Sequence, residues 1–397
     1  MIGGSFQVPN NIKRALGAAA LLLCAGAAWA AAGDPLTGEL PVNELSAGNQ
    51  TQPAIAVDPV GNTVIVWQDD SADGDGSGIL ARRFSPTGVA LGPSFIVNTL
   101  VAGEQSSPDV AMLDDGRFAV VWASNPSGAD PQIRFRSYAA DGSPLADELR
   151  IDPSTQFQAE LPAIAADPQG RFSVVWSGIS VDSESFGIAF RRISATGAGI
   201  GLQQRVNSTE TNAQRRPAID CGLDGGCVVA WQSFEQDGSI NGIYAQRIDP
   251  AGALLGAEIA VNNEINNDQR QAQVQLLPSG QFSIVWSDSN IDGSSLRRFA
   301  ADGSPLGPSV QLNLTDPGSQ FTPSIASDAF GNQLIAWTSD GQDGDLGSII
   351  ARTLSADGSL GAEEIRINLT TAGDQDAVVV ALDADGDAVL ALSLIHI

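Results

Sequence analysis

Short apolar runs separated by polar turns recur along the chain from residue 37 onward. Six times an extended apolar stretch leads into a turn, whose Gly is followed six residues later by a Trp. Next come a polar loop, a second apolar run such as ILARRF (79–84) and another turn. The repeat closes on a Val-Asn pair or a relative of it. Short β-branched runs between Gly, Asp and Pro turns are typical of antiparallel strands. The pattern predicts four strands in each repeat.

The repeats are nearly constant in length. Their tryptophans are Trp67, Trp122, Trp176, Trp231, Trp286 and Trp337, at intervals of 51 to 55 residues. A four-stranded unit of this size cannot bury both of its faces, so neighbouring units must stack. Radial stacking predicts an all-β fold, a seven-bladed β-propeller of four-stranded antiparallel blades. The tryptophans are expected in the blade cores, each against the next blade, and an open string of small β-sandwiches is the alternative.

The two ends of the chain are expected to share the last blade. Residues 39–53 match residues 94–108 position for position, although no earlier strands of a repeat precede them. The final repeat has its first strand and its turn, but Leu392 stands where a seventh Trp is expected. We therefore predict a ring over residues 37–391 whose last blade is incomplete, lacks its third strand and is closed by the N-terminal strand. Closure removes the unpaired edges of an open array.

The last six residues, LSLIHI (392–397), match the in-frame translation of a common transposase-type sequencing adaptor. We interpret them as an artefact that cuts the natural chain short, and a genuine divergent terminus is the alternative. The only histidine, His396, lies in this segment. On this interpretation no catalytic triad or imidazole base can be built from the chain, and no catalytic residue is assigned.

Residues 1–30 have the pattern of a signal peptide. Lys13 and Arg14 precede an apolar run that ends in an Ala28-x-Ala30 cleavage pattern. A run of about 16 apolar residues rich in Ala and Gly is short for a membrane span. We expect an exported protein, periplasmic, extracellular or at the cell surface, with no direct membrane insertion after cleavage.

The chain is strongly acidic, with 46 Asp and Glu against 20 Lys and Arg and a formal net charge of −26 at pH 7. So negative a protein repels phosphate backbones, which excludes nucleic acid as a partner. Cys221 and Cys227 flank the turn GLDGG at paired positions of a hairpin. In an oxidising compartment this predicts a disulfide, and a metal site is the alternative. We expect a monomer.

The loops after the second strands and the crossovers between repeats are expected on one face of the ring, which we call the loop face. Several of these loops combine Asp with Gly, a pattern suited to Ca²⁺. The candidate metal ligands are Asp69, Asp70, Asp73 and Asp75 in the first repeat and Asp340, Asp343 and Asp345 in the sixth. The alternative is ordinary turn chemistry, in which Asp accepts backbone N–H bonds. No cofactor other than calcium is expected.

Two resemblances follow from these residues. The segments Asp73-Gly74-Asp75-Gly76 and Asp343-Gly344-Asp345 resemble the calcium loops of integrin-type propeller repeats, but lack the leading and trailing Asp of that family. The repeat as a whole resembles those of uncharacterised secreted bacterial β-propeller proteins over nearly all of residues 37–391. That resemblance implies an architecture and no activity.

The third strands carry an arginine column, which consists of Arg82, Arg136, Arg191, Arg297 and Arg352, with Gln246 in the fourth repeat. One arginine per blade on an outer strand cannot converge on the ring axis. Salt bridges between blades are therefore the expected role of the column.

The preferred functional interpretation is a non-catalytic exported or cell-surface module of the binding or adhesion type, with a loop face that binds a glycan or a protein. The alternative is a carboxylate-based glycan hydrolase or lyase that uses the same face. A hydrolase needs two carboxylates about 5–10 Å apart in a shared cleft, whereas a binding ring spreads its acids evenly. The first repeat is the most acidic and is where such a pair is expected.

Overall fold

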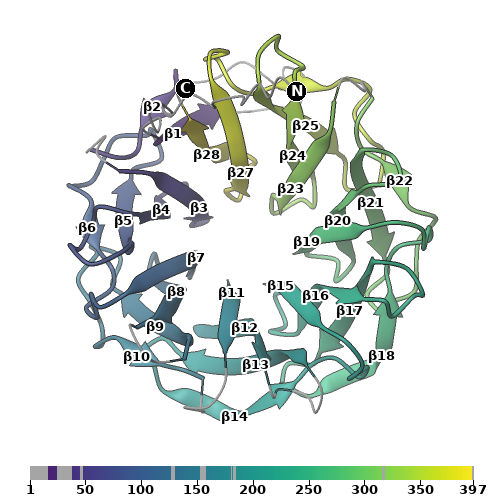
Figure 1. The fold of residues 1–397 in the computed structure, drawn as a ribbon, viewed down its shortest axis with the longest axis horizontal. Helices are drawn as coiled ribbons and strands as arrows, with labels where there is room; N and C mark the ends of the chain where they lie inside the picture. Colours follow the sequence, from purple (N-terminus) through teal and green to yellow (C-terminus); the bar gives the residue numbers. More distant parts are fainter. Residues whose placement is uncertain are drawn as a thin grey trace, which may run out of the picture.

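The computed structural model shows a ring of β-sheets around a central channel (Figure 1). The structure describes residues 17–24, 38–44, 48–126, 130–152, 158–179, 181, 185–314 and 318–395. Every regular element among these residues is a strand, and no helix capable of crossing a membrane occurs in them. The prediction of an all-β propeller is confirmed.

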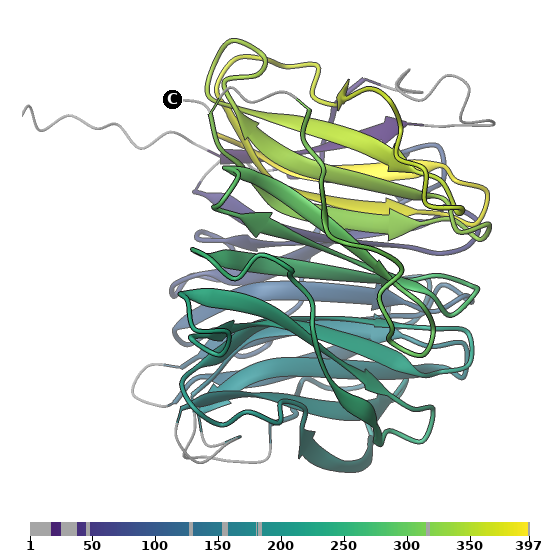
Figure 2. The same ribbon diagram turned by 90° about the vertical axis from the view of Figure 1, so that its right-hand side faces the viewer.

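Six of the sheets are each built from four strands that follow one another in the chain. Their strands are β3 (Gln50–Val57), β4 (Thr63–Asp69), β5 (Gly78–Phe84) and β6 (Phe95–Ile96); β7 (Glu104–Met112), β8 (Phe118–Asn125), β9 (Gln132–Tyr138) and β10 (Leu149–Arg150); β11 (Ala159–Ala166), β12 (Arg171–Ile179), β13 (Phe186–Ser194) and β14 (Gly199–Arg205); β15 (Gln214–Cys221), β16 (Cys227–Phe234), β17 (Asn241–Ile248) and β18 (Leu254–Ala260); β19 (Gln269–Leu276), β20 (Phe282–Asp288), β21 (Gly293–Phe299) and β22 (Val310–Gln311); and β23 (Gln320–Ser327), β24 (Gln333–Asp340), β25 (Gly347–Leu354) and β26 (Ile365–Arg366). The first strand of each sheet lies at the channel and the fourth at the outer rim (Figure 1). We refer to these sheets as blades one to six. Figure 2 shows the sheets stacked side by side around the ring.

The remaining sheet joins the two ends of the chain. It contains β1 (Gly17–Cys24), β2 (Leu40–Pro41), β27 (Asp374–Leu382) and β28 (Ala388–Ile395) in the order β2-β1-β28-β27. We call it the closing sheet. The fourth strand comes from the N-terminal segment, as predicted, and Glu39 Oε1 there accepts the Leu369 N–H at 2.7 Å.

The prediction that this last blade lacks its third strand is wrong. Strand β1, which lies within the segment predicted to be a signal peptide, occupies the third position and pairs antiparallel with β28 from Gly17↔Ile395 to Cys24↔Ala388. Without β1, the backbone groups of β28 on that side would be left unpaired. The structure thus has six blades of consecutive strands and a composite four-stranded sheet, where the sequence predicted seven blades with the last incomplete. Cleavage of the leader stays a prediction.

The closing sheet also accommodates part of the proposed adaptor segment. Leu392 takes the position of the missing Trp, is 1% exposed, and packs against residues of blade six. His396 lies outside the described residues.

The tryptophans are core residues, and all six are at most 1% exposed. Trp122, together with Val120 on the same strand, packs against Ile79 of the preceding blade. Val121, which lies between them, faces the following blade instead. The expectation that each Trp packs against the next blade is therefore wrong. Side chains alternate along a strand, and the sequence pattern does not tell which face turns toward which neighbour.

The Asn that closes a repeat connects strands and blades. In blade one, Asn98 Oδ1 accepts the N–H of Ile79 on the third strand at 2.8 Å. In blade six, Asn368 Nδ2 donates to Oε1 of Gln375 on the next inner strand at 3.0 Å. Equivalent Asn-to-Gln bonds join Asn43 to Gln50, Asn207 to Gln214, Asn262 to Gln269 and Asn313 to Gln320. These bonds explain why the two amides recur seven residues apart.

The arginine column also joins blades, but not in the expected way. Each guanidinium donates to the backbone carbonyl that closes the preceding repeat; Arg82 reaches Val42 O and Arg136 reaches Val97 O, both at 2.8 Å. Arg191, Arg297 and Arg352 do the same with Ile151, Val261 and Leu312. Only Arg82 among the column adds an ion pair in the described structure, with Glu44 at 3.1 Å. Salt bridges are thus not the main role of the column.

Candidate functional site

The channel opens toward the loop face in a cavity of about 360 Å³. The early parts of all seven inner strands line this cavity, which we call the mouth cavity. At the opposite end of the same strands lies a second hollow of about 250 Å³. The two ends differ in chemistry, and we describe the mouth cavity first.

A ring of strained residues lines the mouth cavity. Each inner strand shifts register by a bulge, as between Thr51 and Ala54 in β3. Within every bulge one residue has a φ between 50° and 57°, and these residues are Gln52, Ser107, Leu161, Arg216, Gln271, Thr322 and Ala377. The left-handed conformation costs a residue other than Gly about 1–2 kcal/mol. Such strain is concentrated at functional sites, where the surrounding structure maintains it.

Among the residues that line the mouth cavity, only Asp109 and Arg216 can carry a charge. Asp109 lies one residue beyond the bulge of β7, and its carboxylate accepts the N–H groups of Ile164 at 2.8 Å and Val110 at 2.9 Å. Burial raises the pKa of Asp109 to about 7, although both N–H bonds act to lower it. This carboxyl therefore changes its charge near neutral pH.

A group of three carboxylates stands at the rim of the mouth cavity. Asp340 ends β24 of blade six, and Asp374 and Asp376 lie on β27 of the closing sheet. Asp374 Oδ1 accepts the Gly347 N–H at 3.0 Å. Thr338 Oγ1 donates to Asp376 Oδ1 at 3.1 Å. We call these three acids the rim acids.

Of the rim acids, Asp376 adjoins the cavity directly. Asp376 precedes Ala377, which lines the cavity and whose N–H donates to the Asp376 carboxylate at 2.5 Å. Thr338 also contacts Thr322, another lining residue, with 3.2 Å between the hydroxyl oxygens. The carboxylate of Asp376 is thus anchored at the edge of the mouth cavity.

The rim acids perturb one another. The pKa of Asp340 is raised, first by burial and then by the negative charges of Asp374 and Asp376. A carboxyl whose pKa is raised beside other carboxyl groups is suited to the role of a general acid. The acids that influence one another are thus gathered at blade six and the closing sheet rather than at the first repeat, where a pair was expected.

The predicted calcium ligands of the first repeat are used in local contacts. Asp69 accepts a bond from Gln50 Nε2 at 3.2 Å, and Asp70 accepts the N–H and the side-chain amide of Asn49 at 2.6 and 2.8 Å. Asp73 accepts Nδ2 of Asn98 at 2.7 Å. Asp75 accepts the N–H of Gly103 at 3.4 Å. These bonds attach the loop to the strands and crossovers beside it.

The sixth repeat shows the same pattern except at Asp340. Asp343 accepts Nδ2 of Asn368 at 2.9 Å, and Asp345 accepts the N–H of Gly373 at 3.1 Å. The structure therefore brings Asp340 into the rim acids and disperses the other six candidates along the blade seams. Calcium binding by these loops stays a prediction.

The opposite end of the channel, formed by the turns between first and second strands, carries a different acidic group. Asp383, Asp385 and Asp387 have ligand oxygens within 4.8 Å of one another, and no other such trio occurs among the described residues. They belong to one turn, in which Asp383 accepts the N–H groups of Gly386 and Asp387 at 3.1 and 2.9 Å. Burial and the hydrogen bond with Asp385 raise the pKa of Asp383 to about 6. Turn capping accounts for this arrangement.

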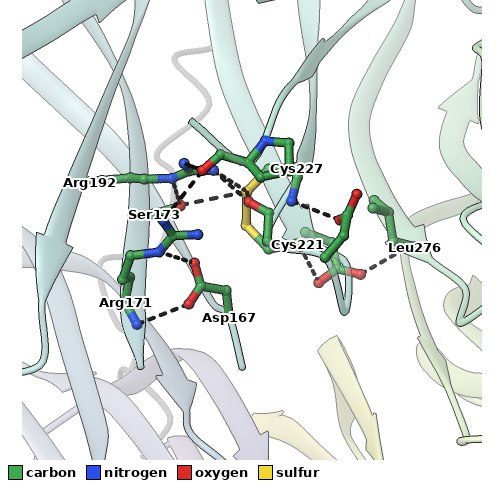
Figure 3. Close-up of a disulfide and its surroundings, with 12 residues drawn as sticks. Asp167, Arg171, Ser173, Arg192, Cys221, Cys227 and Leu276 are labelled. Carbon is green, nitrogen blue, oxygen red and sulfur yellow. Dashed lines mark hydrogen bonds and ion pairs between the residues drawn. A yellow bond between two sulfur atoms is a disulfide. The ribbon is translucent and has the colours of Figure 1, made fainter. Parts of the chain in front are cut away.

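The same end holds the disulfide Cys221–Cys227, which confirms the predicted pairing across the hairpin of β15 and β16. Figure 3 shows Arg192 directed at the disulfide, beside Ser173. Its guanidinium is buried and donates to the carbonyl of Gly225 at 2.6 Å. Disulfides persist in oxidising compartments, so this bond indicates an exported protein.

Four residues of the mouth cavity and its rim were not selected from the sequence, namely Asp109, Arg216, Asp374 and Asp376. A signal for one of them was present, because Arg216 precedes the Pro in the Gln-x-x-Pro crossover that begins at Gln214. The bulge at that motif turns the residue before Pro into the channel. The rim acids gave no such signal, since they come from two different repeats.

The sequence matches no family model, and no curated protein matches it. The fold is similar to solved structures. A protein of unknown function from Dyadobacter fermentans is 13% identical, over 74% of this chain and 95% of that chain, with a TM-score of 0.51. An α-L-arabinanase from Penicillium chrysogenum is 12% identical, over 87% and 93%, with a TM-score of 0.53. An α-L-arabinofuranosidase from Fusarium graminearum is 11% identical, over 78% and 93%, with a TM-score of 0.54.

These similarities show the propeller fold. They also correct the preferred interpretation of the sequence, a non-catalytic binding or adhesion module that is not an enzyme. Two of the three structures are named as glycan-cleaving enzymes, and both extend over more than three quarters of this chain. The alternative that the sequence left open is a carboxylate-based glycan hydrolase or lyase.

Proposed function

We propose that the protein is an exported glycan hydrolase whose active site is the rim of the mouth cavity. The arabinanase and arabinofuranosidase among the similar structures make arabinose-containing polysaccharides the first substrates to test. Their low identity carries no catalytic residue over to this chain. The catalytic assignment therefore depends on the geometry of this site alone.

The observation that carries the proposal is the meeting of Asp340 with Asp374 and Asp376 of the next sheet, where the anchored carboxylate of Asp376 borders the mouth cavity. Asp340 is the general acid and protonates the oxygen of the leaving sugar. Asp376 is the base or nucleophile, since Thr338 and the Ala377 N–H hold its carboxylate in place. Both roles are required for glycoside hydrolysis by a pair of carboxyl groups.

Asp374 completes the arrangement as a positioning residue. Its carboxylate is held by the N–H of Gly347, and its charge helps to keep the proton on Asp340. A side chain at Gly347 would meet the Asp374 oxygen, because a Cβ built there lies 2.4 Å from Oδ1. The close approach of loop and carboxylate therefore depends on a Gly at this position.

Export is part of the proposal. The signal-peptide pattern of residues 1–30 and the disulfide Cys221–Cys227 both support a protein that works in the periplasm or outside the cell. Polysaccharides are available as substrates in these compartments.

The test is turnover by the purified full chain on arabinan and arabino-oligosaccharides, measured as the release of reducing ends. We expect Asp340→Asn and Asp376→Asn each to lower kcat by about 10²–10⁴-fold, the contribution of a general acid or base. Asp70→Asn is the matched control, because Asp70 occupies the same repeat position in blade one, three residues after its Trp. We expect this variant to keep wild-type activity.

Two results would overturn the proposal. One is an absence of turnover on a panel of neutral and acidic polysaccharides with wild-type protein that is folded by circular dichroism. The other is wild-type activity in both Asp340→Asn and Asp376→Asn, which would place any catalysis elsewhere.

A further inference from the structure

Arg216 is an unusual cation in this protein. It lies in the bulge of β15, lines the mouth cavity and is exposed. Within the described part of the chain its guanidinium makes no hydrogen bond or ion pair, whereas the backbone N–H of Arg216 donates to Ser177 Oγ at 3.1 Å. In a chain of formal charge −26 an arginine has many possible acidic partners. An arginine that faces a cavity and pairs with no acidic side chain is available to a ligand.

The backbone at Arg216 is held in an unfavourable conformation. Its φ is 53°, and Pro217 follows it. The residue before Pro is further restricted by the proline ring, so the bulge maintains this geometry at a cost. The neighbouring Arg215 points to a different partner, since it pairs with Glu160. Adjacent arginines thus have separate roles, one structural and one facing the cavity.

Two amides extend the set of donors around the mouth cavity. Gln52 uses its carbonyl oxygen to accept the Ser107 N–H at 2.7 Å, and Gln271 uses its oxygen to accept the Ser287 hydroxyl at 3.1 Å. Both side chains line the cavity. With their oxygens engaged in this way, each amide has its NH₂ group left to donate. The cavity therefore presents N–H donors from three blades.

Asp109, the other ionisable residue in the lining, does not neutralise the charge of Arg216. Its pKa of about 7 leaves it largely protonated in mildly acidic solution. Arg216 is then the charged side chain of the cavity lining, to which the rim acids do not belong.

We propose that the mouth cavity binds an anionic substituent of a sugar, a carboxylate or a sulfate group, through Arg216 with Gln52 and Gln271 as additional donors. A guanidinium binds the oxygens of either anion with paired hydrogen bonds. This inference rests on the proposed function, because it names the substrate class of that site.

Calorimetric titration of Asp340→Asn protein at pH 6 tests the inference, because this variant blocks the proposed turnover and leaves the cavity intact. The probes are trigalacturonate, a sulfated galactose trisaccharide and neutral arabinotriose. We expect one or both anionic probes to bind ~10-fold more tightly than arabinotriose. This ratio corresponds to a difference in binding free energy of about 1.4 kcal/mol. Added salt should weaken that binding. The tighter of the two anionic probes identifies the substituent.

Substitutions in the same background assign the effect to the residue. Arg216→Gln should abolish the preference for the anion and leave arabinotriose binding unchanged. Arg366→Gln is the control, because Arg366 is exposed on the outer strand β26 and its removal changes the net charge equally. Equal binding of anionic and neutral probes, or an unchanged preference in Arg216→Gln, would overturn the inference. An inactive wild-type protein that still prefers the anion would contradict only the proposed hydrolysis.

Discussion

Blades one and six look alike in sequence and differ in chemistry. Each carries an Asp three residues after its Trp, Asp70 in one and Asp340 in the other. Asp70 accepts two bonds from Asn49 of its own blade. Asp340 lies beside two carboxylates from the next sheet, and its pKa is raised. The pKa of an acid in such a loop therefore depends on the carboxylates of the neighbouring strand as well as on the loop's own composition.

The first prediction tests whether the buried cores of blades one and six contribute equally to stability. Trp67 and Trp337 are both fully buried against a preceding sheet. Replacing either by Ala should lower the free energy of unfolding by about 3–5 kcal/mol, because a large cavity is left behind. Urea unfolding measures both variants. A cost below about 1 kcal/mol in only one of them would show that the two cores are not equivalent.

The second prediction is that the same substitution, Asp to Asn, has opposite effects on stability in the two loops. Asp70→Asn weakens two hydrogen bonds to a carboxylate and should lower the free energy of unfolding by about 1 kcal/mol. Asp340→Asn should instead raise the melting temperature at pH 7 to 8. The folded state binds the Asp340 proton more tightly than the unfolded state, so ionisation of this group destabilises the fold at high pH.

The gain from Asp340→Asn should shrink as the pH falls and should vanish below about 4, the ordinary pKa of Asp, where the wild-type carboxyl is protonated in both states. Thermal melts across this range measure it. A gain that is independent of pH would contradict the electrostatic origin, and a loss of stability at pH 8 would contradict the comparison itself.

The third prediction has the smallest expected effect. Asp73 and Asp343 lie at the centre of the predicted calcium loops. Each carboxylate accepts a hydrogen bond from the side-chain amide of the Asn that closes its blade. If these loops use the ordinary turn chemistry that is the alternative to calcium, the melting temperature is unchanged by a chelator or by added Ca²⁺. A clear fall with chelator would establish the calcium site that the loop pattern indicates.

Much of the fold was predictable because it repeats. The spacing of the tryptophans defined the blades, and the match of residues 39–53 to a later crossover predicted the closure. The disulfide followed from the hairpin position of Cys221 and Cys227. The third strand of the closing sheet was not predictable, since β1 comes from a segment with the pattern of a leader and pairs with β28 across almost the whole chain.

The site was less predictable than the fold for a physical reason. Asp340 was noticed, but as a metal ligand of its own loop. Asp374 and Asp376 stand more than thirty residues away in another repeat and meet it only when the blades stack. Arg216 is one of two adjacent arginines, and only the bulge decides which of them enters the channel. Pairings between repeats and backbone bulges are not encoded in the local pattern.

The pH dependence of kcat/KM on an arabino-oligosaccharide tests the central claim most directly. A general acid must be protonated, so the alkaline limb of the profile reports Asp340 in the free enzyme. Asp374→Asn should move that limb to lower pH, because one of the charges that raise the Asp340 pKa is removed. Glu104→Gln, the equivalent change beside blade one, should leave the limb in place. An alkaline limb that does not move in Asp374→Asn would contradict the claim that the next sheet makes this acid reactive.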